Sequence, residues 1–248
     1  MSHVIRTVPG ISSSDRDFVE RLAATGDTSA LVPIYSGRNN LYRTADSRLC
    51  VKEFRVPGMF KRFIYGFLRK SKAFRAFDNA LELEKLGIST PGPLAAVECR
   101  KSGFIGRTYY ICEYLPGWSE MRGVEQRPDF PDFARSLAEF IYRLHRNGVL
   151  MKDFSQGNVL FRKSGAYYEF TLVDINRMEF EIEDRYSLLR NFGSPLDTEE
   201  GVRQLGRQYA NMCDTPALEN EIVEIYRQRQ KQLWRKRHIK EFIRGKKK

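Results

Sequence analysis

The apolar positions of this chain change their spacing about halfway along its 248 residues. Between about Leu31 and Tyr114 they fall in short segments rich in β-branched and aromatic residues, a pattern typical of strands: LVPIYSG, NLYRT, RLCVKEF, PLAAVEC and TYYICEY. One stretch in this region, roughly Ser71 to Leu86, has helical spacing instead and is closed by Gly87 and Pro91. The first half is therefore predicted to be β-rich with one main helix.

Helical spacing predominates in the second half. After LPGW, five apolar residues recur every three or four positions and lead into Gly148, namely Phe133, Leu137, Phe140, Ile141 and Leu144. Two short strands, NVLF and EFTLVD, flank a turn, and the chain from about Arg185 onward is again helical. We therefore predict an α+β fold with a β-rich lobe at residues 1–115 and a helical lobe at residues 116–248, joined near Glu113 to Gly117.

Composition places the chain among globular proteins, since 42% of its residues are hydrophobic and 12% aromatic. No apolar run approaches the roughly 18 to 20 residues that span a bilayer. The N-terminus lacks the apolar core of a signal peptide, so we expect a cytoplasmic protein. The four cysteines form no CxxC pair and the three histidines are dispersed, which indicates neither a zinc site nor a disulfide framework.

The net charge of +11 is concentrated in two blocks. Residues 227–248 carry eleven Lys and Arg against one Glu, and residues 54–77 carry seven Lys and Arg, no acid and seven aromatics. Such blocks suit anionic partners, either nucleic acid or the phosphates of a membrane surface. Two structural alternatives remain open: aromatics packed within the first lobe, and a solvated C-terminal helix.

Polar residues that could take part in binding or catalysis occur in a definite order along these elements. A glycine turn, YSGRNN, contains Gly37 and precedes a strand that carries Lys52; a helix with acidic residues follows. The loop in MKDFSQGNVLF then places Asp153 five positions before Asn158, and Asp174 ends the strand in LVDINRM. Each residue alone is explained by ordinary strand or turn chemistry. The complete order is that of the protein-kinase-like phosphotransfer template.

Each of these residue types meets a requirement of phosphoryl transfer, which depends on positioning and charge neutralisation. A lysine on a rigid strand holds nucleotide phosphates, as predicted for Lys52. Asp153 orients the attacking hydroxyl or accepts its proton. Asn158 and Asp174 supply the hard oxygen ligands that Mg2+ prefers. ATP and Mg2+ are therefore the expected cofactors.

Two longer segments carry a resemblance to a known family. RLHRNGVLMKDFSQGNVLF followed by TLVDINRMEF resembles the lipopolysaccharide kinase family of Kdo and heptose kinases, and GISTPGPLAAVE is similar to that group and to its RIO-like and aminoglycoside-kinase relatives. The resemblance covers roughly residues 31–180. It implies phosphorylation of a sugar of the lipopolysaccharide inner core, with Asp153 as the catalytic residue, Asn158 and Asp174 at the metal, and Lys52 as the strand lysine.

The chain departs from the eukaryotic protein-kinase pattern at three places. Met151 and Lys152 stand where those kinases have His and Arg, and His145 is interpreted as a packing residue of the preceding helix. Asp174 is followed by Ile-Asn-Arg in place of Phe-Gly. The glycine turn has a single glycine, so Arg38 or Asn39 is expected to contact the phosphates.

The acidic partner of Lys52 is not fixed by the sequence. Asp78 and Glu82 lie four residues apart on one helical face, and either one can pair with Lys52. The resemblance favours Asp78, which lies nine residues before Gly87. The predicted cofactor-binding set is Lys52, Asp78, Gly37, Arg38 and Glu113.

We accordingly expect an ATP- and Mg2+-dependent kinase that acts on a sugar hydroxyl of an inner-core glycolipid, with peripheral contact to the anionic surface of the inner membrane. Two alternatives belong to other classes. One is a RIO-like kinase or ATPase bound to RNA or ribosomal particles, for which the basic tail would be the binding surface. The other is a non-catalytic binding module that has kept the fold.

Overall fold

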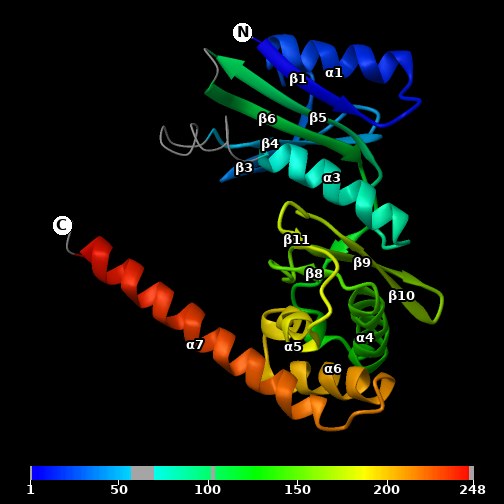
Figure 1. The fold of residues 1–248 in the computed structure, drawn as a ribbon, viewed down its shortest axis with the longest axis vertical. Coiled ribbons are helices and arrows are strands. Elements are labelled where there is room, and N and C mark those ends of the chain that lie inside the picture. Colours follow the sequence, from blue (N-terminus) through cyan, green and yellow to red (C-terminus); the bar gives the residue numbers. More distant parts are fainter. Residues whose placement is uncertain (1, 57–69, 102–103, 246–248) are drawn as a thin grey trace. The chain divides into compact units, whose positions relative to one another are not determined.

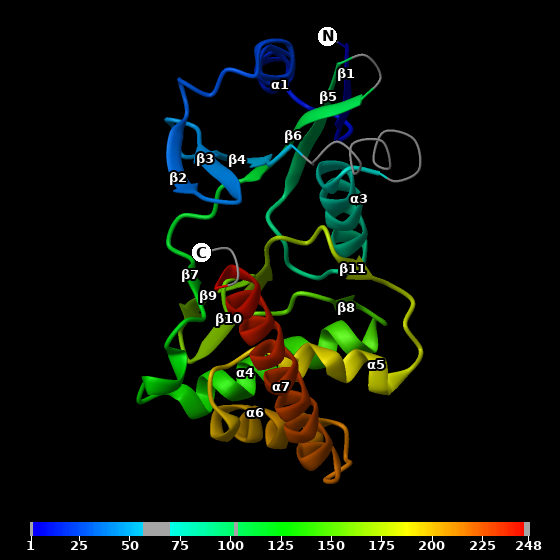
Figure 2. The same cartoon turned by 90° about the vertical axis from the view of Figure 1, so that its left-hand side faces the viewer.

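The computed structural model describes residues 2–56, 70–101 and 104–245 of the chain. The chain divides into two compact units (Figures 1 and 2): Met1–Gly117 with Asp174–Arg177, and Trp118–Val173 with Met178–Lys248. The predicted division placed the whole chain after residue 115 in the second lobe. In the structure, the four-residue segment Asp174–Arg177 belongs to the first unit.

The first unit is built on a six-stranded antiparallel sheet with the order β1-β5-β6-β4-β3-β2. Its strands are β1 (Ser2–Thr7), β2 (Val32–Ser36), β3 (Asn39–Arg43), β4 (Leu49–Phe54), β5 (Pro93–Lys101) and β6 (Phe104–Glu113). The described part of the unit also contains helices α1 (Ser13–Thr25) and α3 (Lys72–Lys85). The five strand-like segments and the helix predicted from the sequence are confirmed as β2 to β6 and α3. Strand β1 and helix α1 were not predicted.

The two faces of this sheet have different partners. Val51 on β4 packs into a core with Val19 and Leu22 of α1. Successive strand residues point to opposite faces of the sheet, so Lys52 and Phe54 share one face and Val51 lies on the other. Helix α3 packs on β5 and β6, and the ammonium of its first residue, Lys72, lies 5.9 Å from the centroid of the Phe54 ring. Helix α3 therefore covers the face that carries Lys52.

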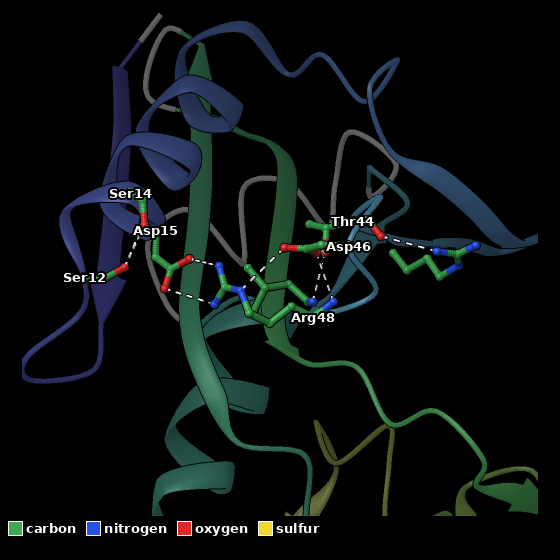
Figure 3. Close-up of polar contacts among 8 residues, drawn as sticks. Ser12, Ser14, Asp15, Thr44, Asp46 and Arg48 are labelled. Atoms are coloured by element: carbon green, nitrogen blue, oxygen red, sulfur yellow. Dashed lines mark hydrogen bonds and ion pairs between the residues drawn. The ribbon is translucent and has the colours of Figure 1, made fainter.

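Helix α1 is fixed at its first turn by a polar cluster (Figure 3). The Ser12 hydroxyl accepts the backbone N–H of Asp15 at 3.1 Å and caps the helix. The Asp15 carboxylate is ion-paired with Arg48, which lies in the turn between β3 and β4. In that turn Asp46 accepts the Arg48 backbone N–H at 3.1 Å. The hydrogen bond from Arg48 lowers the pKa of Asp15, which is the direction expected for a stabilised carboxylate.

The second unit contains short strands and the longer helices. Its elements are β7 (Ser119–Glu120), η1 (Val124–Gln126), α4 (Phe130–Arg146), β8 (Leu150–Met151), β9 (Val159–Ser164), β10 (Tyr167–Leu172), β11 (Met178–Glu179), α5 (Arg185–Leu189), η2 (Arg190–Gly193), α6 (Glu199–Met212) and α7 (Leu218–Gly245). The five apolar residues whose spacing predicted α4 are all buried. The Phe133 ring contacts three aromatic rings of β9 and β10, with centroids 5.0 to 5.2 Å away: Phe161, Tyr168 and Phe170. The predicted helix and hairpin are confirmed.

The final helix, α7, changes environment along its length. Its first turns pack on α6 and bury Leu218, Ile222 and Val223. Further along, Trp234 and Ile239 are 60% and 58% exposed. No helix within the described ranges has both the length and the apolar character needed to cross a bilayer. Most of the basic block predicted at 54–77 falls at residues 57–69, outside the described residues.

Candidate functional site

Lys52 is held rigidly in the interior of the first unit's sheet. Strand β4 lies between β3 and β6, and Lys52 is in register with Leu41 on one side and Tyr110 on the other. Its side chain is 14% exposed, and its ammonium forms an ion pair with Asp174 Oδ1 at 2.6 Å. A strand flanked on both sides cannot shift by one residue without exposing its buried face, so the position of Lys52 is strongly specified.

Asp174 adopts a left-handed backbone conformation, with φ of 56°. Few residues other than glycine occupy this region, although Asp and Asn do so more often than most. Two side-chain amides hold the turn: Asn176 Nδ2 donates to Asp174 Oδ1 at 2.5 Å, and Asn79 Nδ2 of α3 donates to the Ile175 carbonyl at 2.6 Å. The strained conformation is thus maintained by specific contacts, which is typical of functional positions. Lys52 and Asn176 both contact the same carboxylate oxygen, Oδ1.

The predicted ion pair between Lys52 and an acid of α3 is not found among the described residues. Asp78 is paired with Arg6 at 2.8 Å and with Lys70 at 2.6 Å. Glu82 is paired with Lys85 at 3.0 Å. The prediction of this pairing was wrong because strand β1, which carries Arg6 and was not predicted, supplies a cation beside the helix. A direct hydrogen bond from α3 to the Asp174 segment is made by Asn79.

Gly37 and Arg38 form the turn between β2 and β3. A Cβ atom at Gly37 would lie only 2.5 Å from the Tyr35 hydroxyl, so the Tyr35 side chain lies against Gly37, and both residues are exposed. Glu113 ends β6, where its backbone N–H donates to the Gly92 carbonyl at 2.8 Å. The next N–H, that of Tyr114, donates to the Arg48 carbonyl at 2.9 Å. Both donors are therefore already used within the unit.

In the second unit, the loop that contains Asp153 is anchored on both sides. Met151 precedes it in β8, is buried, and pairs with Met178 of β11. Lys152 forms an ion pair with Glu179 of the same ladder. Phe154, directly after Asp153, is 4% exposed. The two residues that depart from the His and Arg of eukaryotic kinases thus serve to fix the loop.

Asn158 is oriented by its own loop. Its Nδ2 donates to the Asp153 carbonyl at 2.9 Å, and its backbone carbonyl accepts the N–H of Val173 at 2.9 Å. Because the amide nitrogen is engaged, the amide oxygen is the atom left to act as a ligand. An amide oxygen here and the Asp174 carboxylate in the first unit are hard donors, so their chemistry fits Mg2+. The structure thus brings Lys52 to Asp174 in the first unit, and Asp153 to Asn158 in the second.

His145 is a buried structural residue, as its interpretation as a packing residue requires. Its Nδ1 lies 2.8 Å from the Tyr209 hydroxyl, and Asn191 Nδ2 lies 3.1 Å from its Nε2. With Nε2 accepting from the amide, the proton of the neutral ring is on Nδ1 and is donated to Tyr209. Burial lowers the pKa of His145 to about 3. The neutral ring therefore joins α4, η2 and α6.

Two residues of this arrangement were missed by the sequence interpretation, Asn79 and Asn176. The Asp-x-Asn spacing after the strand is a recognisable signal, since Asn side chains commonly hydrogen-bond neighbouring groups in turns. Asn79 carries no such signal, because its partner, Ile175, is 96 residues away in the sequence.

Comparison with known proteins identifies the family. The model of the lipopolysaccharide kinase (Kdo/WaaP) family matches residues 35–209. No curated relative matches the chain by sequence. A solved structure described as WaaP in complex with acyl carrier protein is similar with a TM-score of 0.61 and 15% identity, over 93% of this chain and 99% of that one. A Rio2 kinase from Chaetomium thermophilum, solved as an ADP/Mg2+-phosphoaspartate complex, gives a TM-score of 0.46 and 15% identity, over 92% of this chain and 82% of that one.

The family model covers well over half of the sequence, and the fold shared with WaaP extends over nearly the whole chain. The predicted α+β, protein-kinase-like fold and the predicted phosphotransferase class are both confirmed. The chain belongs to the lipopolysaccharide kinase (Kdo/WaaP) family, and it is a kinase.

Proposed function

We propose that this kinase transfers the γ-phosphoryl group of ATP to a sugar hydroxyl of the lipopolysaccharide inner core, or of a similar glycolipid. The observation that carries the proposal is the 2.6 Å ion pair between Lys52 and Asp174. Phosphoryl transfer from a nucleotide uses a strand lysine for the phosphates and an acid for the metal ion, and this ion pair brings two such groups together. Its occurrence in a chain matched by the lipopolysaccharide kinase model favours a lipopolysaccharide sugar as the acceptor.

The nucleotide is assigned to residues of the first unit. Lys52 binds its phosphates, and Arg38 of the single-glycine turn contributes a second cation. Gly37, Glu113 and Asp78 remain predicted cofactor-binding residues, although Asp78 is paired with Arg6 and Lys70 and not with Lys52.

Asn158 and Asp174 are assigned to Mg2+. Magnesium, when bound, neutralises charge on the transferring phosphates. The Asn158 amide is oriented for this role by the Asp153 carbonyl, and the Asp174 carboxylate by Asn176. Lys52 and Asn176 both contact Asp174 Oδ1, so two side chains restrain the orientation of the carboxylate.

Asp153 is assigned to the acceptor. Its carboxylate orients the sugar hydroxyl and takes the proton as the hydroxyl oxygen bonds to the γ-phosphorus and the bond to ADP breaks. The buried neighbours Met151 and Phe154 fix the backbone on either side, so the carboxylate is presented from a rigid loop. Such positioning contributes to rate by removing motion that the reactants would otherwise have to lose.

The exposed half of α7 supports a glycolipid acceptor at a membrane surface. Trp234 and Ile239 are exposed there among basic residues. Aromatic and aliphatic residues interspersed with cations are typical of interfacial helices, and anionic lipid attracts each cation. We therefore assign peripheral contact with an anionic leaflet to this helix.

The experiment is mass spectrometry of core glycolipid from cells with and without the gene, complemented by wild type, Asp153→Ala or Asp132→Ala. Asp132 is a suitable control because it is an exposed acid of α4, in the same unit, paired with Arg135. We expect one phosphate on an inner-core sugar with wild type and Asp132→Ala, and its loss with Asp153→Ala. An identical core in cells with and without the gene would contradict the proposed acceptor.

A further inference from the structure

Lys72, the first residue of α3, is a half-buried lysine without an ion pair to any described residue. Its ammonium lies 5.9 Å from the centroid of the Phe54 ring. Lys70, two positions earlier, is different: it is exposed and paired with Asp78 at 2.6 Å. Burial of a lysine that lacks a carboxylate partner costs free energy, so the position of Lys72 requires an explanation.

Lys72 belongs to a cluster of positive charge in the first unit. The same Phe54 ring lies 5.4 Å from the ammonium of Lys52. Burial lowers the pKa of Lys72, and the positive charges of Arg38 and Arg177 lower it further, while Asp174 opposes them. Lys52 and Lys72 thus lie near the same ring, and the charges of Arg38, Arg177 and Asp174 all act on Lys72.

Such a cluster is suited to a polyanion. Like charges held together repel one another, and a bound anion with several charges relieves that repulsion. The glycine turn between β2 and β3 contains a single glycine, Gly37, and an exposed cation, Arg38. Lys52, Arg38 and Lys72 are thus three described cations of this unit that can contact phosphates.

We propose that Lys72 binds the polyphosphate of the nucleotide together with Lys52 and Arg38, so that the start of α3 adds phosphate-binding charge to that of the strand and of the single-glycine turn. This inference rests on the proposed function, because it assigns a further residue to the same nucleotide site. A phosphate group already present on the acceptor has similar chemistry, and the experiment separates the two sources.

The experiment uses the full chain, with Lys72→Met, Lys72→Arg and, as matched control, Lys70→Met. Calorimetry measures binding of Mg-ATP, inorganic tripolyphosphate, adenosine and orthophosphate, and thermal melts establish that each variant is folded. We expect Lys72→Met to weaken binding of ATP and tripolyphosphate by about tenfold, as for loss of a charge-assisted contact. Adenosine binding should not change, Lys72→Arg should retain most of the affinity, and Lys70→Met should remain within about twofold of wild type.

Each other outcome has a definite meaning. Equal affinity of wild type and Lys72→Met for ATP and tripolyphosphate overturns the inference, while the proposed function stands if wild type still transfers phosphate. An equal loss of adenosine binding overturns it as well, because the effect would then be structural. Weakened orthophosphate binding with tripolyphosphate binding intact overturns it in favour of an acceptor phosphate. Tripolyphosphate binding that depends on Lys72, in a protein that does not use ATP, supports the anion site and contradicts the proposed function. If Lys72→Met does not fold, Lys72→Arg decides: loss of tripolyphosphate binding in that folded variant, which keeps the charge, contradicts a role based on charge.

Discussion

Replacement of Asn79 tests whether α3 positions the segment that contains Asp174. The Asn79 amide of α3 donates to the Ile175 carbonyl at 2.6 Å, next to Asp174 in its left-handed conformation. Asn79→Ala removes this donor and leaves the carbonyl without it. Asn79→Asp keeps the shape of the side chain but places an acceptor against an acceptor, so its effect should be larger.

The magnitude follows from the worth of one such bond. A neutral hydrogen bond contributes a net of about 1 kcal/mol, which corresponds to a factor of about five in an equilibrium constant. If that free energy stabilises the left-handed conformation of Asp174, its loss lowers the population of the binding-competent turn by up to the same factor. We therefore expect Asn79→Ala to weaken Mg2+-dependent nucleotide binding by up to about fivefold, with little change in adenosine binding.

The assay is calorimetric titration of each variant with nucleotide at limiting Mg2+, which measures the nucleotide affinity. Asn147→Ala is the matched control, because Asn147 also donates its side-chain amide to a backbone carbonyl, that of Arg143 at 2.8 Å, at the exposed end of α4. That variant should bind nucleotide as wild type does. Unchanged Mg2+-dependent affinity in Asn79→Asp, the stronger perturbation, would refute the coupling between α3 and Asp174.

Three further predictions concern other parts of the chain. As the pH falls from about 7.5 to 5, the free energy of unfolding should decrease by about 2 kcal/mol because of His145. Burial holds the pKa of His145 at about 3 in the folded protein, so only the unfolded chain, in which the pKa is near 6.5, takes up the proton. This loss, measured by denaturant titration, should be absent in His145→Gln; equal pH dependence in both would be contrary to the burial argument. Lys52→Met should impair nucleotide use with a preserved melting temperature, since Met keeps the apolar stem; a collapsed melting temperature with normal turnover of the folded fraction would make Lys52 structural. A last variant replaces four exposed cations of α7 by Gln, namely Lys231, Arg235, Lys236 and Arg237. It should bind anionic vesicles at low salt about tenfold or more weakly than wild type, with the same melting temperature. Unchanged binding would leave α7 as a solvated helix.

Local signals in the sequence predicted most of the fold. The strand segments β2 to β6 and helix α4 carry strong periodicity and form where expected. Helix α3 also ends at a residue suited to termination, since Gly87 adopts φ of 66°. Strand β1 was missed because it owes its place to pairing with β5, about 90 residues further along the chain, and such pairing leaves no local trace.

The same distinction applies to the candidate site. Lys52, Asp153, Asn158 and Asp174 were singled out because each occupies a specific place on a predictable element. The acidic partner of Lys52 was not predicted correctly, because Asp78 is paired with Arg6 and Lys70. Arg6 comes near Asp78 only when β1 joins the folded sheet. The contacts of Asn79 with Ile175 and of Lys72 with Phe54 join different elements of the first unit, so they depend on tertiary structure.

The most direct test of the central claim separates nucleotide binding from phosphate transfer. Single-turnover transfer from Mg-ATP to a purified inner-core acceptor is measured for wild type, Asp153→Ala and Asp174→Asn, alongside their affinities for Mg-ATP. If Asp153 serves the acceptor hydroxyl, Asp153→Ala should lose transfer by at least about a hundredfold and bind Mg-ATP nearly as wild type does. Asp174→Asn should lose affinity at limiting Mg2+, because a charged oxygen ligand is removed. Transfer by Asp153→Ala within about tenfold of wild type would contradict the assignment of Asp153 as the catalytic residue of this kinase.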